Sequence, residues 1–218
     1  MQIHLRQLAP LHIEKEKWKT SQIWEKNITI DKGEHLHIVA PSGSGKTSLI
    51  QFIYGMRNDY DGAVLYDDKN IKSFSAENFS PFRQNKISII FQDLRLFDDQ
   101  PVKQNIEIKR ILDPFHPAEK IEQMANRLGI QNKLNQLAKN CSYGEQQRIA
   151  IIRALMQPFD FLLLDEPYSH LDENNRKKAM DLIYEECAAR NAAMIFADLK
   201  ALDFLKNEKI NHIHYRHF

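Results

Sequence analysis

A glycine-rich loop decides the fold, and it reads Ala40-Pro41-Ser42-Gly43-Ser44-Gly45-Lys46-Thr47. It follows the apolar segment Leu36 to Val39 and opens a helical segment, Ser48 to Tyr54, that Gly55 ends. The two glycines let backbone N–H groups turn inward around phosphate oxygens, and the helix N-terminus adds its positive dipole end. Lys46 would reach the β- and γ-phosphates of a nucleotide, and the Thr47 hydroxyl would reach Mg²⁺. We therefore predict that residues 40–48 bind phosphate.

Ala40 stands where a glycine is usual in such loops. A small residue is tolerated at a strand-to-loop junction unless the backbone needs a positive φ there. The alternative interpretation is a serine- and glycine-rich turn with a lysine beside it, because similar strings also occur by chance. The rest of the chain favours phosphate binding.

The composition indicates a globular protein of 218 residues, enough for one large domain or for one domain with an inserted subdomain. Hydrophobic residues make up 43% and charged residues 27%, unlike disordered, collagenous or coiled-coil chains. The 30 basic and 29 acidic residues leave a net charge of +1, so no overall field attracts nucleic acid or an anionic membrane. We expect no nucleic-acid partner.

The sequence predicts a cytoplasmic location. Its apolar stretches fall short of the ~18 residues of a membrane-spanning helix, and residues 1–6 lead into no signal-peptide hydrophobic region. Cys141 and Cys187 form neither a disulfide framework nor a metal-binding spacing. A chain without an export signal meets reducing conditions.

Short apolar segments without period-2 alternation are typical of strands buried on both faces of a parallel sheet. They are Leu36 to Val39, Ile87 to Phe91, Phe161 to Leu164 and Met194 to Phe196. Helical stretches lie between them, and one of these is expected to begin at an N-cap on Asp172. The pattern predicts an α/β fold.

Two carboxylates, Asp165 and Glu166, end the strand that begins at Phe161. Open α/β sheets bind ligands at the carboxyl edge of their strands, so Asp165 is placed to orient Mg²⁺. Glu166 can polarise a water for attack on the γ-phosphate, because a hydrolase needs a base near the metal carboxylate but separate from it. The alternative is an ordinary acidic turn at a strand end.

The glycine-rich loop and the strand-end carboxylates follow one another as in the ATP-binding cassette (ABC) family, and the chain resembles this family over essentially its whole length. Phe91-Gln92 looks like the glutamine loop of that family, Cys141-Ser142-Tyr143-Gly144-Glu145-Gln146-Gln147-Arg148 looks like its signature loop, and Ser169-His170-Leu171-Asp172 is similar to its D-loop. The resemblance implies that Gln92 contacts Mg²⁺ and senses a membrane partner. It also implies that Ser142, Gly144 and Glu145 contact ATP held by a second subunit. Trp18 lies where the family places an aromatic residue that stacks on adenine, although a structural role in hydrophobic packing is the alternative.

The sequence departs from the family pattern at two functional positions. Tyr143 stands where the signature loop usually has a glycine, and its side chain must point away from the nucleotide or narrow the site. The histidine that the family places after the last buried strand corresponds to Ala197, and no histidine lies between His170 and His212. Loss of one transition-state contact costs about 10²- to 10³-fold in rate, so we expect slow hydrolysis unless a partner supplies the donor.

The resemblance implies a single ABC nucleotide-binding domain over residues 1–218. We expect an α/β P-loop NTPase core of mostly parallel sheet with an N-terminal antiparallel β part, over residues 1–91 and 149–218, and an inserted helical subdomain over residues 92–148. Within the family, the Phe82 to Gln92 stretch of this chain is most similar to the lipoprotein-release, macrolide-export and cell-division group.

The implied function is an ATPase subunit that binds and hydrolyses MgATP in a head-to-tail dimer, with Glu166, Lys46 and Gln92 as catalytic residues. The second subunit is an identical or a different cassette. An integral membrane permease would hold the chain at the inner face of the cell membrane. An ATP-gated regulatory module with little hydrolysis is the alternative, which Tyr143 and Ala197 favour. An ABC protein acting on nucleic acid or ribosomes would usually carry two fused cassettes or a long insertion.

Overall fold

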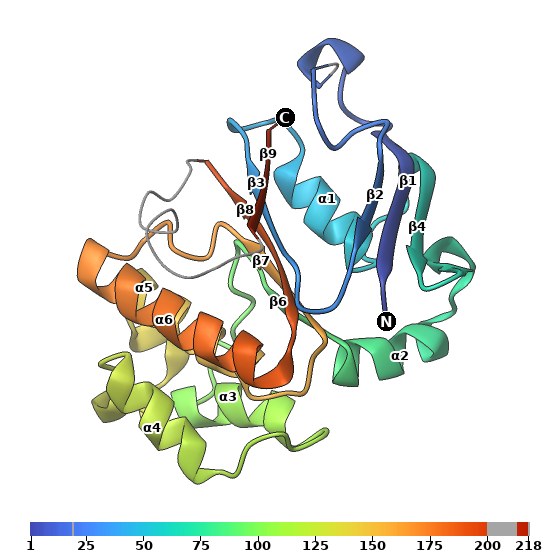
Figure 1. The fold of residues 1–218 in the computed structure, drawn as a ribbon. Helices are drawn as coiled ribbons and strands as arrows, with labels where there is room; N and C mark the ends of the chain where they lie inside the picture. Colours follow the sequence, from blue (N-terminus) through green and yellow to red (C-terminus); the bar gives the residue numbers. More distant parts are fainter. Residues whose placement is uncertain (19, 200–212, 218) are drawn as a thin grey trace.

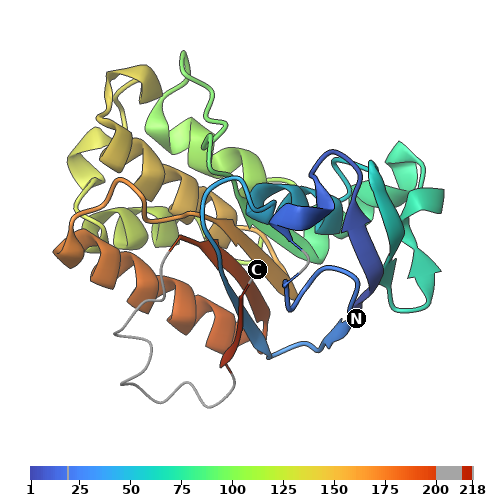
Figure 2. The ribbon, with the colours of Figure 1, turned by 90° about the horizontal axis from the view of Figure 1, so that it is seen from above.

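Two β-sheets and a set of helices make up the fold, with helix α1 (Lys46–Ile53) between the two sheets (Figure 1). This computed structural model describes residues 1–18, 20–199 and 213–217, so His212 lies outside the described residues. The helices α3 (Val102–Arg110), α4 (Glu119–Arg127), α5 (Tyr143–Leu155) and α6 (Glu173–Arg190) cover the other face of the larger sheet (Figure 2).

The larger sheet is parallel throughout, in the order β6-β7-β8-β3-β9. Its strands are β3 (His35–Val39), β6 (Ile87–Ile90), β7 (Phe161–Asp165), β8 (Ala193–Asp198) and β9 (Ile213–His217). Every residue of β6 and β7 is buried, as the absence of alternation in the sequence predicted. The prediction of a buried parallel sheet is confirmed.

The smaller sheet is antiparallel, in the order β2-β1-β4-β5. Its strands are β1 (Ile3–Pro10), β2 (Asn27–Ile30), β4 (Tyr60–Tyr66) and β5 (Lys69–Asn70). Together the two sheets confirm the α/β fold with an N-terminal antiparallel part. The antiparallel sheet packs with α1 against one face of the parallel sheet, in a cluster that includes Leu5, Phe52 and Leu163.

The other α-helices are α2 (Ala76–Asn85), α3 (Val102–Arg110), α4 (Glu119–Arg127), α5 (Tyr143–Leu155) and α6 (Glu173–Arg190). The short 3-10 helices are η1 (Lys15–Lys17), η2 (Ile71–Ser73), η3 (Gln131–Lys133) and η4 (Ala138–Asn140). Asp172 caps α6 as expected, because its carboxylate accepts a hydrogen bond from the Asn175 N–H at 2.8 Å.

Strand β8 separates the two halves of the core. Met194 and Phe196 belong to the cluster under α3 to α6, while Ile195 and Ala197 belong to the cluster around α1. Helices α3 and α4 lie within residues 92–148 and share the first of these clusters with α6. The division of the chain at residues 92 and 148 stays a prediction.

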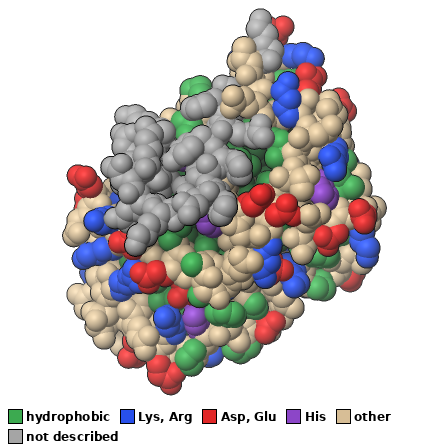
Figure 3. All heavy atoms as spheres, in the orientation of Figure 1, with side chains coloured by type: hydrophobic (Ala, Val, Ile, Leu, Met, Phe, Trp, Pro, Cys, Tyr) green, Lys and Arg blue, Asp and Glu red, His purple; other side chains and the backbone are tan. Residues whose placement is uncertain are grey.

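The described helices include none that is both long and apolar enough to span a bilayer. On the face drawn in Figure 3, Lys and Arg side chains are interspersed with Asp and Glu side chains, as a net charge of +1 leads one to expect.

Candidate active site

The glycine-rich loop connects β3 to α1 and borders a cavity of about 300 Å³. Gly43 and Gly45 have φ angles of 78° and 99°, in the left-handed region that glycine tolerates best. Gly45 is the N-cap of α1, so the first backbone N–H groups of the helix lie at the loop. The cavity is lined by His12, Ile13, Ser42, Gly43, Gly45, Lys46, Thr47, Ser48, Gln92 and Glu166.

Ala40, Pro41 and Ser44 belong to the part of the loop that faces away from the cavity. Ala40 is buried and has no positive φ, so the alanine fits a position where glycine is usual. The buried Ser44 donates a hydrogen bond to the Pro41 carbonyl at 2.8 Å. Ala40, Pro41 and Ser44 therefore shape the loop and do not line its cavity.

Lys46 crosses the mouth of the loop and is 4% exposed. Its Nζ donates hydrogen bonds to the carbonyls of Ala40 and Pro41 at 2.8 Å each and lies 3.6 Å from Glu166 Oε1. A buried ammonium among backbone carbonyls is well placed to receive phosphate oxygens.

Three oxygen-bearing side chains meet beside Lys46, and they come from three separate elements. Thr47 Oγ1 donates to Asp165 Oδ1 and to Gln92 Oε1, with both distances 3.2 Å. Burial raises the pKa of Asp165 to about 6, against the hydrogen bond from Thr47, which lowers it. A carboxylate this poorly solvated gains from a cation beside it. A hydroxyl, an amide oxygen and a carboxylate are the hard oxygen ligands that suit Mg²⁺, so the donor set fits this ion.

Glu166 follows β7 in an unusual backbone conformation, with a φ of 46°. Its N–H donates to the Ala197 carbonyl at 2.9 Å, which ties it to the neighbouring strand β8. Its side chain lines the same cavity as Lys46 and Thr47. The strand-end carboxylates and the glycine-rich loop are therefore brought together.

A second cavity of about 370 Å³ lies beside the first and is lined by Thr47, Gln51, Phe91, Gln92, Asp93, Tyr143 and Asp165. The Tyr143 hydroxyl donates to the Gln92 carbonyl at 3.1 Å, and its ring meets the His170 ring edge-on at 4.2 Å. The tyrosine thus contacts two loops of its own chain.

The neighbouring residues Ser142, Gly144 and Glu145 lie at the start of α5. Ser142 caps the helix, and its side chain and that of Glu145 each accept a hydrogen bond from the other's backbone N–H. A Cβ on Gly144 would lie 3.0 Å from the His170 carbonyl oxygen, which explains the need for a small residue. These three residues line neither of the two cavities next to the glycine-rich loop.

A family model described as ABC transporter matches residues 25–169. The chain belongs to the ABC transporter family. It is 32% identical over 187 residues to the lipoprotein-releasing system ATP-binding protein LolD of Buchnera aphidicola, which covers 84% of this chain and 81% of that protein. It is 33% identical to the thiamine import ATP-binding protein ThiQ of Haemophilus influenzae, covering 78% and 77% of the two chains.

Another relative is the macrolide export ATP-binding/permease protein MacB of Nitrosomonas europaea, which is 29% identical over 78% of this chain but only 26% of that protein. Among solved structures, a dimeric bacterial ABC transporter cassette matches 99% of this chain and 94% of its own, with a TM-score of 0.81 and 21% identity. The fold of this chain is therefore that of ABC cassettes, and the predicted family is confirmed.

Trp18, for which stacking on adenine and hydrophobic packing were both open, does not line the cavity at the glycine-rich loop. It is 5% exposed and packs in the cluster around α1, and its Nε1 donates to the Ile13 carbonyl at 3.1 Å. The Lys15 ammonium lies 5.5 Å from the centre of its ring. This packing favours the alternative role in hydrophobic packing, and stacking on adenine stays a prediction.

His12 is the ring that borders the cavity instead. Its Nε2 lies 2.9 Å from Ser48 Oγ and its Nδ1 lies 3.1 Å from Asp59 Oδ2, so both nitrogens are held. His12 was not singled out from the sequence, because a histidine six residues before a tryptophan attracts less attention than the larger ring.

Ala197 is fully buried, and its side chain packs with Leu163 and Ile195 in the cluster around α1. The side chain at this position therefore faces the core. The next residue, Asp198, ends β8 and adjoins the loop, because its carbonyl accepts from the Ala40 N–H at 3.1 Å. That the absence of a histidine slows hydrolysis stays a prediction.

Proposed function

We propose that this chain binds MgATP at residues 40–48 and hydrolyses it, as the ATP-binding subunit of an ABC transporter complex. One observation carries the proposal: three segments far apart in the chain bring together the side chains of Lys46, Thr47, Gln92, Asp165 and Glu166. Convergence of a cation, a metal-type donor set and a second carboxylate is what phosphoryl transfer to water requires.

Each side chain has a distinct task in this proposal. Lys46 neutralises the β- and γ-phosphates, and the loop N–H groups near Gly43 and Gly45 bind their oxygens. Thr47, Gln92 and Asp165 would hold Mg²⁺, which would neutralise charge at the phosphates when bound. Glu166 orients and polarises the attacking water, and His12 forms a wall for the base of the nucleotide.

The proposal includes two protein partners. A second cassette, identical or different, would pair head to tail so that Ser142, Gly144 and Glu145 reach the ATP of the first. Solved dimeric cassettes of the same fold, one of them in a post-hydrolysis state with ADP and Pi, support this arrangement. The second partner would be an integral membrane permease, which would hold this chain at the cytoplasmic face of the cell membrane. The name of MacB, an ATP-binding/permease protein, supports this partner. The names of LolD and MacB support the lipoprotein-release and macrolide-export group.

A module that dimerises with ATP and hydrolyses it slowly is the second candidate. It rests on two sequence features, Tyr143 in the signature loop and the absence of a histidine at the end of β8, and the dimeric neighbour with ADP and Pi does not favour it over hydrolysis. The two candidates share the binding site and differ in the rate of the chemical step, so a turnover measurement separates them.

Binding is tested by calorimetric titration with a non-hydrolysable ATP analogue and Mg²⁺. Lys46→Ala should abolish measurable binding and leave the circular dichroism spectrum unchanged. The matched control is Lys139→Ala, because Lys139 is an exposed lysine paired with Asp99 at 2.7 Å, far along the chain from the loop. Equal affinity of Lys46→Ala and the parent would refute the assignment of the loop.

The base-binding wall is tested in the same titration. His12→Ala should raise the Kd about 2- to 10-fold, because aromatic stacking contributes on the order of 1 kcal/mol. Inorganic triphosphate, which has no base, should bind the variant and the parent equally. An equal loss for triphosphate would show that His12 acts through Ser48 and the loop and not through the base.

A further inference from the structure

A buried glutamine, Gln147, connects helix α5, which begins in the signature loop, to the segment that starts at Glu166. It is 1% exposed. Its Nε2 donates to the Glu166 carbonyl at 3.3 Å and to Ser169 Oγ at 3.4 Å, and its Oε1 accepts from the His170 N–H at 3.1 Å. Both ends of one amide thus bind a single segment, residues 166–170.

The segment needs this support because Glu166 is strained. A non-glycine residue with a φ of 46° lies in the left-handed region, which is sparsely populated and persists only where the surroundings hold it. The Glu166 N–H is held by the Ala197 carbonyl on β8. Within the described part of the chain, the other hydrogen bond to its carbonyl is a long one, from the Ser169 N–H at 3.4 Å. Gln147 therefore provides the contact from the helix side.

The conformation of this residue determines where its carboxylate lies. The direction of the Cα–Cβ bond follows from φ and ψ, and the side chain reaches the cavity with Oε1 at 3.6 Å from Lys46 Nζ. If the peptide after Glu166 relaxed, the carboxylate would move relative to the phosphate loop. A displacement of about 1 Å is enough to cost about 10²-fold in rate.

We propose that Gln147 is a positioning residue for hydrolysis, which holds the Glu166 backbone so that the carboxylate points at the attacking water. The inference rests on the proposed function, in which Glu166 is the base. It adds a residue of α5, outside the nucleotide cavity, to the groups on which the chemical step depends.

Other contacts on the same face of α5 agree with this role. Tyr143 lies one helical turn before Gln147, and its ring packs against the ring of His170. The backbone at Gly144 also approaches the His170 carbonyl closely. The start of α5 and residues 166–170 are thus joined by a side-chain amide, a ring contact and a close backbone approach. A displacement of the signature helix would be transmitted to the Glu166 backbone.

Gln147→Met tests the inference, because methionine keeps the length of the side chain and removes both hydrogen-bonding groups. We expect kcat for ATP to fall about 10- to 100-fold while KM stays within about 2-fold of the parent. Gln147→Glu is the second variant. This variant keeps the acceptor for the His170 N–H but sets a carboxylate oxygen against the Glu166 carbonyl, so its kcat should fall as well. It also provides a test if Gln147→Met does not fold.

The matched control is Gln146→Met on the same helix. Gln146 donates to the carbonyls of Ala138 and Cys141, so its side-chain amide is bonded to the segment before α5 and not to residues 166–170. Single-turnover hydrolysis is then measured for each variant alone and combined with Glu166→Gln. A residue that acts only through the Glu166 carboxylate should cause no further loss once that carboxylate is gone. Gln146→Met should have the same effect in both backgrounds.

Three results would overturn the inference. Parent-like kcat in both Gln147 variants, with Glu166→Gln inactive, would refute it and leave the proposed function standing. An equal loss in the presence and absence of Glu166→Gln would show a merely structural role. Hydrolysis by Glu166→Gln at the parent rate would refute the base assignment in the proposed function, and the inference with it.

Discussion

At the residue scale, one position on β8 shows how much depends on the direction of a side chain. Ala197 pairs with Asp165 in the parallel ladder and is 0% exposed, with its methyl group in the cluster that contains Leu163 and Ile195. Asp198 is one residue further and adjoins the glycine-rich loop through its backbone. Since neighbouring residues of a strand point to opposite faces, the two positions offer different surroundings to a histidine.

Ala197→His should therefore destabilise the protein and leave hydrolysis no faster. An imidazole in a packed core costs about 1–3 kcal/mol through overpacking alone, which urea unfolding would detect. Asp198→His is the comparison variant, and it should fold normally and raise steady-state ATPase turnover. Faster hydrolysis by Ala197→His at parent stability would mean that the side chain at 197 does reach the γ-phosphate.

Single residues also show which parts of the site could be predicted from the sequence and which could not. The roles proposed for Lys46, Thr47 and Asp165 depend on a loop between a strand and a helix, and the structure brings these residues together as expected. The two roles considered for Trp18 could not be separated from the sequence, because a distance along the chain does not tell which side of a loop faces a cavity. Gln147 was not singled out, because its role depends on a contact across 19 residues that no spacing rule reveals.

At the scale of elements, the strands of the parallel sheet were predictable because burial on both faces leaves continuous apolar runs. The structure moves each end of the predicted segments by at most two residues: β8 is longer, at Ala193–Asp198, and β6 ends one residue earlier than predicted, at Ile90. The strands of the antiparallel sheet were expected only as a part of the family fold. Their individual bounds were not predicted, because β1 has a register shift between Arg6 and Ala9 that interrupts a regular pattern.

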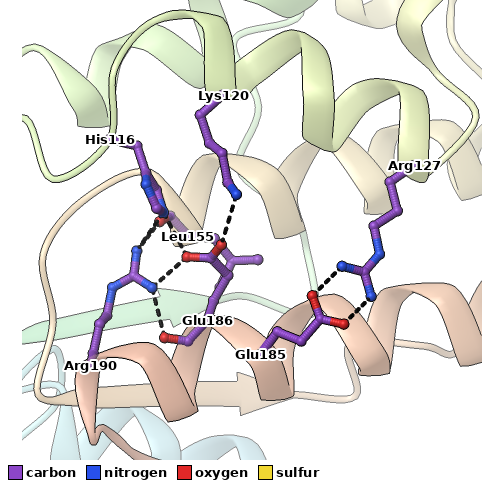
Figure 4. A network of polar contacts seen from close by, with 7 residues as sticks. All are labelled: His116, Lys120, Arg127, Leu155, Glu185, Glu186 and Arg190. Carbon is purple, nitrogen blue, oxygen red and sulfur yellow. Dashed lines mark hydrogen bonds and ion pairs between the residues drawn. The ribbon is translucent and has the colours of Figure 1, made fainter.

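Helix α6 is joined to the chain before α4 by a buried charge network (Figure 4). Glu186 on α6 lies 2.6 Å from His116 Nε2 and 2.5 Å from Arg190 Nη1, and Lys120 Nζ lies 3.7 Å away. Burial acts to raise the pKa of Glu186, but the hydrogen bonds and positive charge of His116 and Arg190 outweigh it and lower the pKa to about 2. Burial lowers the pKa of Arg190, which still remains protonated at any working pH.

This network should make stability sensitive to acid. The folded-state pKa of Glu186 is below its unfolded value, so the stabilisation is present above about pH 4.5 and is lost as the pH falls toward 2. The full effect is about 3 kcal/mol, as an order of magnitude. Glu186→Gln should flatten the fall of the unfolding free energy over this range, as measured by urea titration at several pH values.

Glu185→Gln is the matched control for that measurement. Glu185 is the adjacent residue, its side chain is 62% exposed, and its partner Arg127 lies at the surface. Exposed ion pairs contribute about 0–1 kcal/mol, so this variant should retain most of the acid sensitivity of the parent. Equal curves for the two variants would show that the buried network contributes no more than a surface pair.

At the scale of the whole molecule, the two halves of the proposed ATP site lie apart in one chain. Lys46 and Glu166 line the cavity at the glycine-rich loop, whereas Ser142, Gly144 and Glu145 line neither of the cavities beside it. Tyr143 is 44% exposed and is held to Gln92 and His170 of its own chain. The start of α5 therefore does not contribute to the glycine-rich-loop cavity of its own chain, and in the proposed dimer it would contact the nucleotide of the second molecule.

Glu166→Gln should accumulate as a dimer when ATP and Mg²⁺ are present. The substitution removes the base but keeps the size and hydrogen bonding of the side chain, so ATP persists between the two cassettes and the closed state does not reopen. Size-exclusion chromatography with light scattering would show a doubled mass with ATP and a monomer with ADP. The control is the double variant Lys46→Ala, Glu166→Gln, which should stay monomeric because Lys46→Ala prevents ATP from binding. A Glu166→Gln protein that retains ATP yet stays monomeric would mean that the signature residues need a different cassette as partner, and mixing with candidate partner cassettes would then be expected to restore the doubled mass.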